Sequence, residues 1–536
     1  MSNQAVDTNG WHTVAAVHYA DLNRAILAEG KTPAGFDITA SDGSAKAEGT
    51  FGPWSIQTGG SGPLIMMALP ITGGTITIGG KATPITPCTA TVKITASFLD
   101  EVTLKHTKHT LKNDTTVPVS VESCLPKQPN FMDEAVLVEL LGTWLNQNLA
   151  DFNAVFGAVD LDAEYVSEGL SWLKPSFKGY GVAEHAINPT LENSTFAILC
   201  LIDDQAPPDG LANMVSPYAI PDGCDAAFLL SPDKFLTHMM LASTPLMFQN
   251  IDNDPAGDHF VIDNQGTRIS STSSLTLKPF RLSGGKLVDS AVIDAGNFGI
   301  EISETELLLN ITSMSFGYSL GVTIKLDYIG RSVVEYPTKD GNGAFIDVLG
   351  LTVVGESGGG SVEVSKALDY ATSILGVTSA LTGLFGGIAG MVGKSAAIAG
   401  KAAGTTALQI GEAAGYDAEV VASNMARGIT GFMKAGSLEL EGFSSQCFGL
   451  MKFAGLASFA TAILPATMAI LKAVADGDYQ SLPKITDLTS SAIGKTVIWP
   501  AAVPEFTVKS AQLNGCLQFG LVHQSASPKN PAPATS

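Results

Sequence analysis

The sequence is poor in positive charge. It carries 30 Lys and Arg residues against 51 Asp and Glu residues, which gives a formal net charge of -21. A surface of this sign repels a phosphate backbone, so nucleic acid is excluded as an expected partner. The same sign disfavours simple electrostatic docking on anionic bilayers, and any membrane contact would therefore depend on apolar burial. A basic protein partner remains compatible with the charge.

Cysteine is also scarce, and no leader is recognisable. No C-x-x-C pair occurs, and the cysteines are too few for a disulfide scaffold, so they indicate core thiols of a reducing compartment. They are Cys88, Cys124, Cys200, Cys224, Cys447 and Cys516. The stretch from Met1 to Asp7 has neither a basic nor an apolar region. We expect cytoplasmic synthesis without a signal peptide, with leaderless release left open.

The sequence is rich in apolar residues, and in long stretches these alternate with polar residues. It is 45% hydrophobic and 15% charged, and at this length more than one structural unit is expected. From residue 51 to about 125 apolar residues recur with period two, as in Ile76-Thr77-Ile78, and residues 196–335 return to this pattern. Both stretches predict antiparallel strands.

Between the two β blocks the period changes. From Met132 to Phe156 apolar residues recur at spacings of three and four, and the series includes Leu137, Leu141 and Leu145. This spacing predicts a long amphipathic helix with one apolar face. We place these three leucines among the residues expected to contact lipid or another apolar ligand.

A segment rich in Ala and Gly follows the second β block. Residues 370–393 and 453–471 contain no formal charge, and both are long enough to cross a bilayer. Their high content of small residues favours buried or lipid-shielding helices, while a membrane-inserting helical hairpin remains an alternative. Further apolar contacts are expected at Leu381, Leu384, Phe385, Ile388, Met391, Phe453, Phe459 and Ile463.

One stretch matches the G-x-S-x-G pattern of a serine nucleophile, with Ser357 at its centre. A hydrolase also needs a histidine to take the hydroxyl proton, and only His523 lies downstream. The strands before the motif alternate in antiparallel style and lack the βαβ order of hydrolases. We therefore expect no enzyme and interpret the motif as a Gly/Ser joint.

Two patterns suggest metal ligands, and neither is complete. The acidic stretch 252–263 partly matches a calcium loop, but Ala256 occupies a ligand position and Pro255 stiffens the backbone. His106 and His109 would share a face only on a helix, whereas the residues before them favour a strand. We expect a surface turn and solvated strand histidines, with no metal and no other cofactor.

These patterns predict a division of the chain. The expected parts are 8–160, a first β/helix unit; 161–355, a second β-rich unit; 360–480, the Ala/Gly-rich helical segment; 484–523, closing strands; and 524–536, a mobile tail. The helical segment would thus be inserted before the last strands.

Several motifs carry a resemblance to a known family. They are Thr8-Asn9-Gly10-Trp11-His12-Thr13-Val14 with Leu22-Asn23-Arg24-Ala25-Ile26, Trp54-Ser55-Ile56 with Gly59-Gly60-Ser61 and Leu69-Pro70-Ile71, Ala227 to Leu236, and Trp499-Pro500 with Leu513 to Gly520. Together they resemble the P47 family of tubular lipid-binding (TULIP) proteins, which are encoded beside OrfX proteins and large bacterial toxins. The resemblance covers most of the chain outside residues 360–480.

The resemblance implies an α+β fold of the TULIP type, with long helices wrapped by curved antiparallel sheets. It also implies lipid or apolar-ligand binding and accessory work for a toxin, and it supplies no catalytic residue. We therefore expect a non-enzymatic protein that associates with lipid or membrane. The alternative from another class is a scaffold that binds a basic partner or toxin without lipid.

Overall fold

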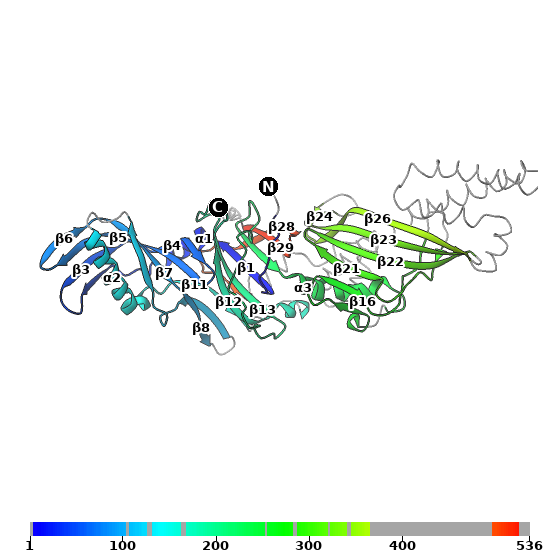
Figure 1. Cartoon of the computed structure of the whole chain (residues 1–536), viewed down its shortest axis with the longest axis horizontal. Coiled ribbons are helices and arrows are strands. Elements are labelled where there is room, and N and C mark those ends of the chain that lie inside the picture. The colour runs from blue at the N-terminus through cyan, green and yellow to red at the C-terminus, as the bar shows by residue number, and fades with distance from the viewer. Residues whose placement is uncertain are drawn as a thin grey trace, which may run out of the picture. The chain divides into compact units, whose positions relative to one another are not determined.

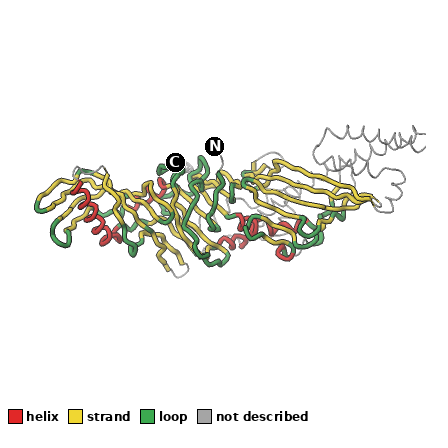
Figure 2. Tube along the Cα trace, viewed as in Figure 1, coloured by secondary structure: helices red, strands yellow, loops and turns green. Residues whose placement is uncertain are grey.

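The computed structural model describes residues 4–102, 107–125, 131–161, 168–251, 255–281, 287–319, 322–339, 345–364 and 496–524. Strands dominate the described residues (Figure 2). The chain divides into two compact units, the first formed by Met1–Ser231 and Lys484–Ser536 and the second by Pro232–Pro483. All strand pairs among the described residues are antiparallel, as the alternating pattern predicted.

A six-stranded sheet forms one end of the first unit (Figure 1). In spatial order its strands are β12 (Pro175–Ala183), β13 (Thr195–Ile202), β1 (Thr13–His18), β14 (Ala226–Leu230), β29 (Leu517–His523) and β28 (Phe506–Leu513). Every residue of β13 is buried, which explains its continuous apolar run. The last two strands in the sequence thus belong to the same sheet as the first one. The expected boundary after residue 160 lies inside this unit.

A second sheet of the first unit is organised around one long strand. Its strands are β10 (Ser120–Leu125), β7 (Cys88–Ile94), β5 (Leu64–Ile78), β3 (Ala45–Phe51) and β2 (Gly35–Thr39), with β4 (Ser55–Ser61) and β6 (Lys81–Ile85) also paired to β5. The first part of β5 pairs with β4 on one side and β7 on the other, and the second part pairs with β3 and β6. A bulge interrupts the ladder between β3 and β5 near this change of partners. Gly74 lies next to it, where a Cβ would clash with the Glu48 carbonyl oxygen.

Two helices pack on these sheets. They are α1 (Tyr19–Glu29) and α2 (Phe131–Asn148); a 3-10 turn (Leu149–Asp151) follows α2 and another spans Glu168–Leu173. The smallest sheet of the unit contains β27 (Val497–Ile498), β11 (Val155–Asp160), β9 (Thr107–Asn113) and β8 (Ala96–Val102).

The helix predicted from Met132 to Phe156 is longer than α2, the helix that the structure shows. Helix α2 ends at Asn148, whose side-chain amide donates to the Trp144 carbonyl at 2.8 Å and so satisfies a carbonyl of the last turn. Phe156 lies in β11, which pairs with β9. Tertiary pairing thus overrides the helical spacing of the last residues.

Each helix is fastened by one asparagine to a backbone N–H and C=O. Asn23 of α1 donates to the Ile56 carbonyl at 2.8 Å and accepts from the Ile56 N–H at 2.7 Å. Asn146 of α2 makes the same pair of bonds with Val119, at 3.0 and 2.8 Å. Asn23 is buried and Asn146 is exposed. The two contacts therefore share a geometry but differ in access to water.

The eight-stranded sheet of the second unit has three long strands. These are β22 (Glu306–Ser319), β23 (Val322–Glu335) and β26 (Gly350–Val364). Its remaining strands are β15 (Phe260–Ile262), β16 (Arg268–Ser271), β17 (Leu275–Thr276), β20 (Val292–Ile293) and β21 (Phe298–Ser303). Two short pairs join β18 (Phe280–Arg281) to β19 (Leu287–Val288) and β24 (Thr338–Lys339) to β25 (Phe345–Ile346). Helical turns span Pro232–Lys234, Phe235–Met240, Leu241–Met247 and Ala256–Asp258.

The matched asparagines give a stability prediction. Asn23→Ala leaves a buried N–H and C=O of Ile56 without partners, so we expect a loss of about 2–4 kcal/mol in the free energy of unfolding. Asn146→Ala removes the partners of the Val119 N–H and C=O from two part-buried bonds at the exposed side chain of Asn146, where water can replace them more easily, and a smaller loss of about 1 kcal/mol is expected. Urea denaturation of both variants measures the difference. Equal losses would show that burial does not set the value of these bonds.

Candidate functional site

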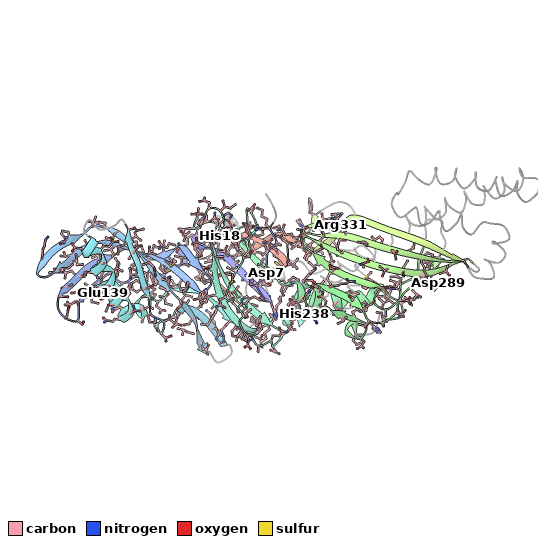
Figure 3. The ribbon with its side chains drawn as sticks, in the orientation of Figure 1. Asp7, His18, Glu139, His238, Asp289 and Arg331 are labelled. Atoms are coloured by element: carbon pink, nitrogen blue, oxygen red, sulfur yellow. The ribbon has the colours of Figure 1, made fainter. Side chains whose placement is uncertain are left out.

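The leucines expected on the apolar face of α2 lie together in the structure. Leu137, Leu141 and Leu145 are all buried, and Leu140 joins them. Exposed Glu139 lies on the same helix (Figure 3). The helix contacts β2, β3, β5 and β10, so its buried leucines lie against the second sheet. Whether these leucines contact a lipid stays a prediction.

An aromatic cluster surrounds the last turns of α2. Its five members are Phe36, Phe51, Trp54, Trp144 and Phe152. The Trp144 ring lies 5.5 Å from that of Phe51, 6.3 Å from Phe36 and 6.3 Å from Phe152, measured between centroids. Trp54 and Phe152 are closer still, at 4.5 Å. The sequence analysis did not group these rings, because they come from β2, β3, α2 and two connecting segments.

This cluster is neither fully buried nor fully exposed. Phe36, Trp54 and Phe152 are buried, whereas Phe51 and Trp144 are half-buried. The indole N–H of Trp54 has no hydrogen-bond acceptor, although the side chain is fully buried. Buried indole donors usually find a partner. The cluster therefore offers two partly exposed rings and one unpaired donor.

The other expected apolar residues lie outside the described part of the chain. They are Leu381, Leu384, Phe385, Ile388, Met391, Phe453, Phe459 and Ile463. Among the described residues, no helix combines the length and hydropathy needed to cross a bilayer.

The structure gives no support to a serine hydrolase. Ser357 lies inside β26, opposite Ile329 of β23, in a ladder that runs from Val322 to Glu335. A nucleophile elbow requires a sharp turn from a strand into a helix, and this register excludes it. The expected flexible joint is also wrong, because the same residues continue the strand.

His523, the one histidine downstream of the motif, belongs to a different cluster. Its Nδ1 lies 3.4 Å from Asp225 and its Nε2 lies 3.2 Å from the buried carboxylate of Asp21. The Nε2 contact has the distance of an ion pair but not the angle of a hydrogen bond. Arg24 also pairs with Asp21, and burial raises the pKa of nearby Cys224. These contacts link α1 to the end of β29. The raised pKa keeps the Cys224 thiol protonated, so it is not an activated nucleophile.

No cluster of metal ligands occurs among the residues that the structure describes. His109 lies in β9 as expected, but it is buried, not solvated, and its Nδ1 lies 2.5 Å from a carboxylate oxygen of Asp100. In the suspected calcium loop, Asp263 accepts from the N–H groups of Thr267 and Arg268. That carboxylate shapes a turn, and residues 252–254 lie outside the described ranges.

His18, at the start of α1, gives a prediction for the pH dependence of stability. Burial lowers its pKa from the ordinary value of 6.5, although Asp225 and Glu192 partly oppose the shift. The unfolded chain then binds a proton at this histidine more readily than the folded one. The contribution of His18 to the free energy of unfolding is therefore fully present above about pH 6.5 and is lost as the pH drops. The stability difference between wild type and His18→Asn should therefore shrink from pH 7.5 to pH 5. Urea titrations at both pH values measure it, and an unchanged difference would contradict this assignment.

Comparisons with known proteins agree on one family. The model described as "OrfX-like: Protein OrfX2/OrfX3/P47" matches residues 8–314. OrfX3 of Paraclostridium bifermentans is 25% identical over 421 residues, which cover 66% of this chain and 82% of that protein. OrfX3 of Clostridium botulinum (strain Kyoto / Type A2) is 26% identical over 377 residues, with 62% and 73% covered.

Solved structures share the fold at lower identity. P47 from Clostridium botulinum A2 superposes with a TM-score of 0.57 at 13% identity, covering 97% of this chain and 99% of that one. P47 of Clostridium botulinum E1 gives a TM-score of 0.54 at 12% identity, with 96% and 99% covered. The fold of this chain is therefore P47-like.

Proposed function

Because this chain belongs to the OrfX-like family of OrfX2, OrfX3 and P47 proteins, we propose that it is a non-enzymatic accessory protein that binds a lipid or another apolar ligand beside α2. The accessory role beside a toxin is the one that the sequence resemblance implied. Membrane association would then follow from the same apolar binding, since the net charge of -21 does not favour anionic bilayers.

The aromatic cluster of α2 carries this proposal. Phe51 and Trp144 are only half-buried, yet they continue into the buried rings of Phe36 and Phe152. An acyl chain laid on these two rings would extend the apolar contact from the core to the surface. Burying roughly ten methylenes contributes about 8 kcal/mol before the costs of ordering the ligand.

The unpaired N–H of Trp54 supports a ligand that also carries an oxygen acceptor. A carboxylate or ester oxygen would satisfy this donor, which has no acceptor although the Trp54 ring lies 4.5 Å from that of Phe152. A fatty acid or an ester lipid fits this combination better than a pure hydrocarbon.

Purification of the full chain tests the proposal directly. We expect native mass spectrometry and lipid extraction to find a co-purifying lipid, and liposome flotation to recover the protein with the vesicles. If all three are negative, lipid binding is wrong, and a protein-interaction scaffold becomes the better hypothesis.

Two matched Trp→Phe variants test the position of the ligand. Trp54→Phe keeps an aromatic ring and removes the unpaired donor, so displacement of a fluorescent fatty acid by palmitate should weaken by about tenfold, the value of one hydrogen bond to a charged group. Trp144→Phe keeps a ring on the half-exposed side, and we expect a change of about twofold or less. Equal changes in both variants would refute the role of the Trp54 donor.

A further inference from the structure

A long connection crosses one face of the six-stranded sheet. It joins β13 to β14 and consists of residues 203–225, which we call the strap. The structure describes all of these residues, and none of them lies in a helix or strand. Connections of this length without secondary structure are uncommon in compact domains and usually have a function, such as that of a lid or a binding loop.

The strap lies over a row of small residues that runs across all six strands. The register of the strand pairs places these residues side by side, one from each strand. In the order of the strands they are Gly181, Ala197, Ala16, Ala227, Gly520 and Ser510. Strap atoms fill the space at both glycines, because a Cβ on Gly181 would lie 2.9 Å from the Asn213 carbonyl oxygen and a Cβ on Gly520 would lie 2.6 Å from Cys224 Sγ. The row is therefore a trough in which the strap lies.

Apolar burial holds the strap only weakly. The buried residues of the strap are Val215, Ser216, Ala219 and Cys224. Val215 and Ala219 belong to the same apolar cluster as the three alanines of the trough. In β13, by contrast, every residue is buried. Releasing the strap thus exposes far less apolar surface than separating the strands beneath it.

Side chains on and beside the sheet fasten the strap at both ends. The Trp11 indole N–H donates to the Ala212 carbonyl at 2.9 Å. The Lys509 ammonium group donates to the Gly223 carbonyl at 2.8 Å. Within the strap, backbone hydrogen bonds close local turns. The strap is therefore held by side-chain donors that address its backbone carbonyl groups.

Gln518 of β29 is the central fastening. Its side-chain amide donates to the Tyr218 carbonyl at 3.1 Å and to the Ala219 carbonyl at 2.9 Å. The Gln512 amide donates to the Gln518 side-chain oxygen at 2.7 Å, which fixes the orientation of the Gln518 amide. Gln518 is 1% exposed. Because a buried amide needs acceptors, the trough is built to hold the carbonyl groups of a peptide.

We propose that the strap is a releasable cover, and that the trough beneath it binds an extended segment of a partner protein. Opening breaks side-chain bonds and a small apolar contact, while the strand ladders of the sheet remain. The partner segment then takes the place of the strap and offers its own carbonyl groups to Trp11, Gln518 and Lys509. An acyl chain fits worse, because it leaves the buried Gln518 amide without acceptors. This site does not depend on a lipid at α2.

Hydrogen exchange of the full chain tests the opening. We expect the amides of residues 211–223 to exchange together, about a hundredfold or more faster than those of β13. Val215→Ser removes a strap contact without changing the sheet, so strap exchange should rise about tenfold and β13 exchange should stay the same. The matched control is Val261→Ser, at a valine of the second unit that is 52% exposed, and it should change neither rate. Exchange of the strap at the rate of β13 would overturn the proposal.

A fluorescent peptide with the sequence of residues 208–223 is the probe for the trough. Fluorescence anisotropy should give a Kd about tenfold lower for the Val215→Ser chain than for wild type, because the weakened strap competes less. The same substitution made in the peptide removes its own apolar contact, so its Kd should rise about tenfold. Nonspecific binding would not give opposite effects in the chain and in the peptide.

A photoreactive leucine at the Val215 position of the peptide locates the contact. Crosslinks should concentrate on β1, β13 and β14, whose side chains surround Val215 in the apolar cluster. Palmitate should not displace the peptide. Absence of peptide binding to the Val215→Ser chain, crosslinks to other elements, or displacement by palmitate would each contradict peptide binding in the trough.

Discussion

The apolar face of α2 is the constraint on which the functional account depends. A helix with four buried leucines has to be covered, and β2, β3, β5 and β10 of one sheet contact it. The cover is incomplete at the end of the helix, where Phe51 and Trp144 remain half-buried. The fold thereby brings an apolar core to the surface at one defined place, and this place is the proposed ligand site.

The first unit also brings together the beginning and the end of the described chain. Its six-stranded sheet has the last two described strands at one edge, so residues from early and late parts of the described chain meet in it. Val6 donates to the Asn514 carbonyl at 2.8 Å, and Asp21 faces His523.

Much of this architecture follows from the sequence. The period-two pattern predicted the antiparallel strands, and Leu137, Leu141 and Leu145, expected on one face of a helix, are all buried. Local spacing failed where tertiary contacts compete with it, since Phe156 joins a sheet and His109 is buried beside Asp100. The aromatic cluster escaped prediction because its rings are distant in the sequence and converge only when β2, β3 and α2 pack. No periodic pattern reveals an unpaired indole N–H.

A crystal structure with a fatty acid brominated near the end of its chain tests the central claim most directly. The account predicts an anomalous bromine peak in contact with Phe51 or Trp144, and a carboxylate within hydrogen-bond distance of Trp54 Nε1. A fully occupied ligand elsewhere on the protein, or no bromine peak beside α2 at saturating fatty acid, would contradict it.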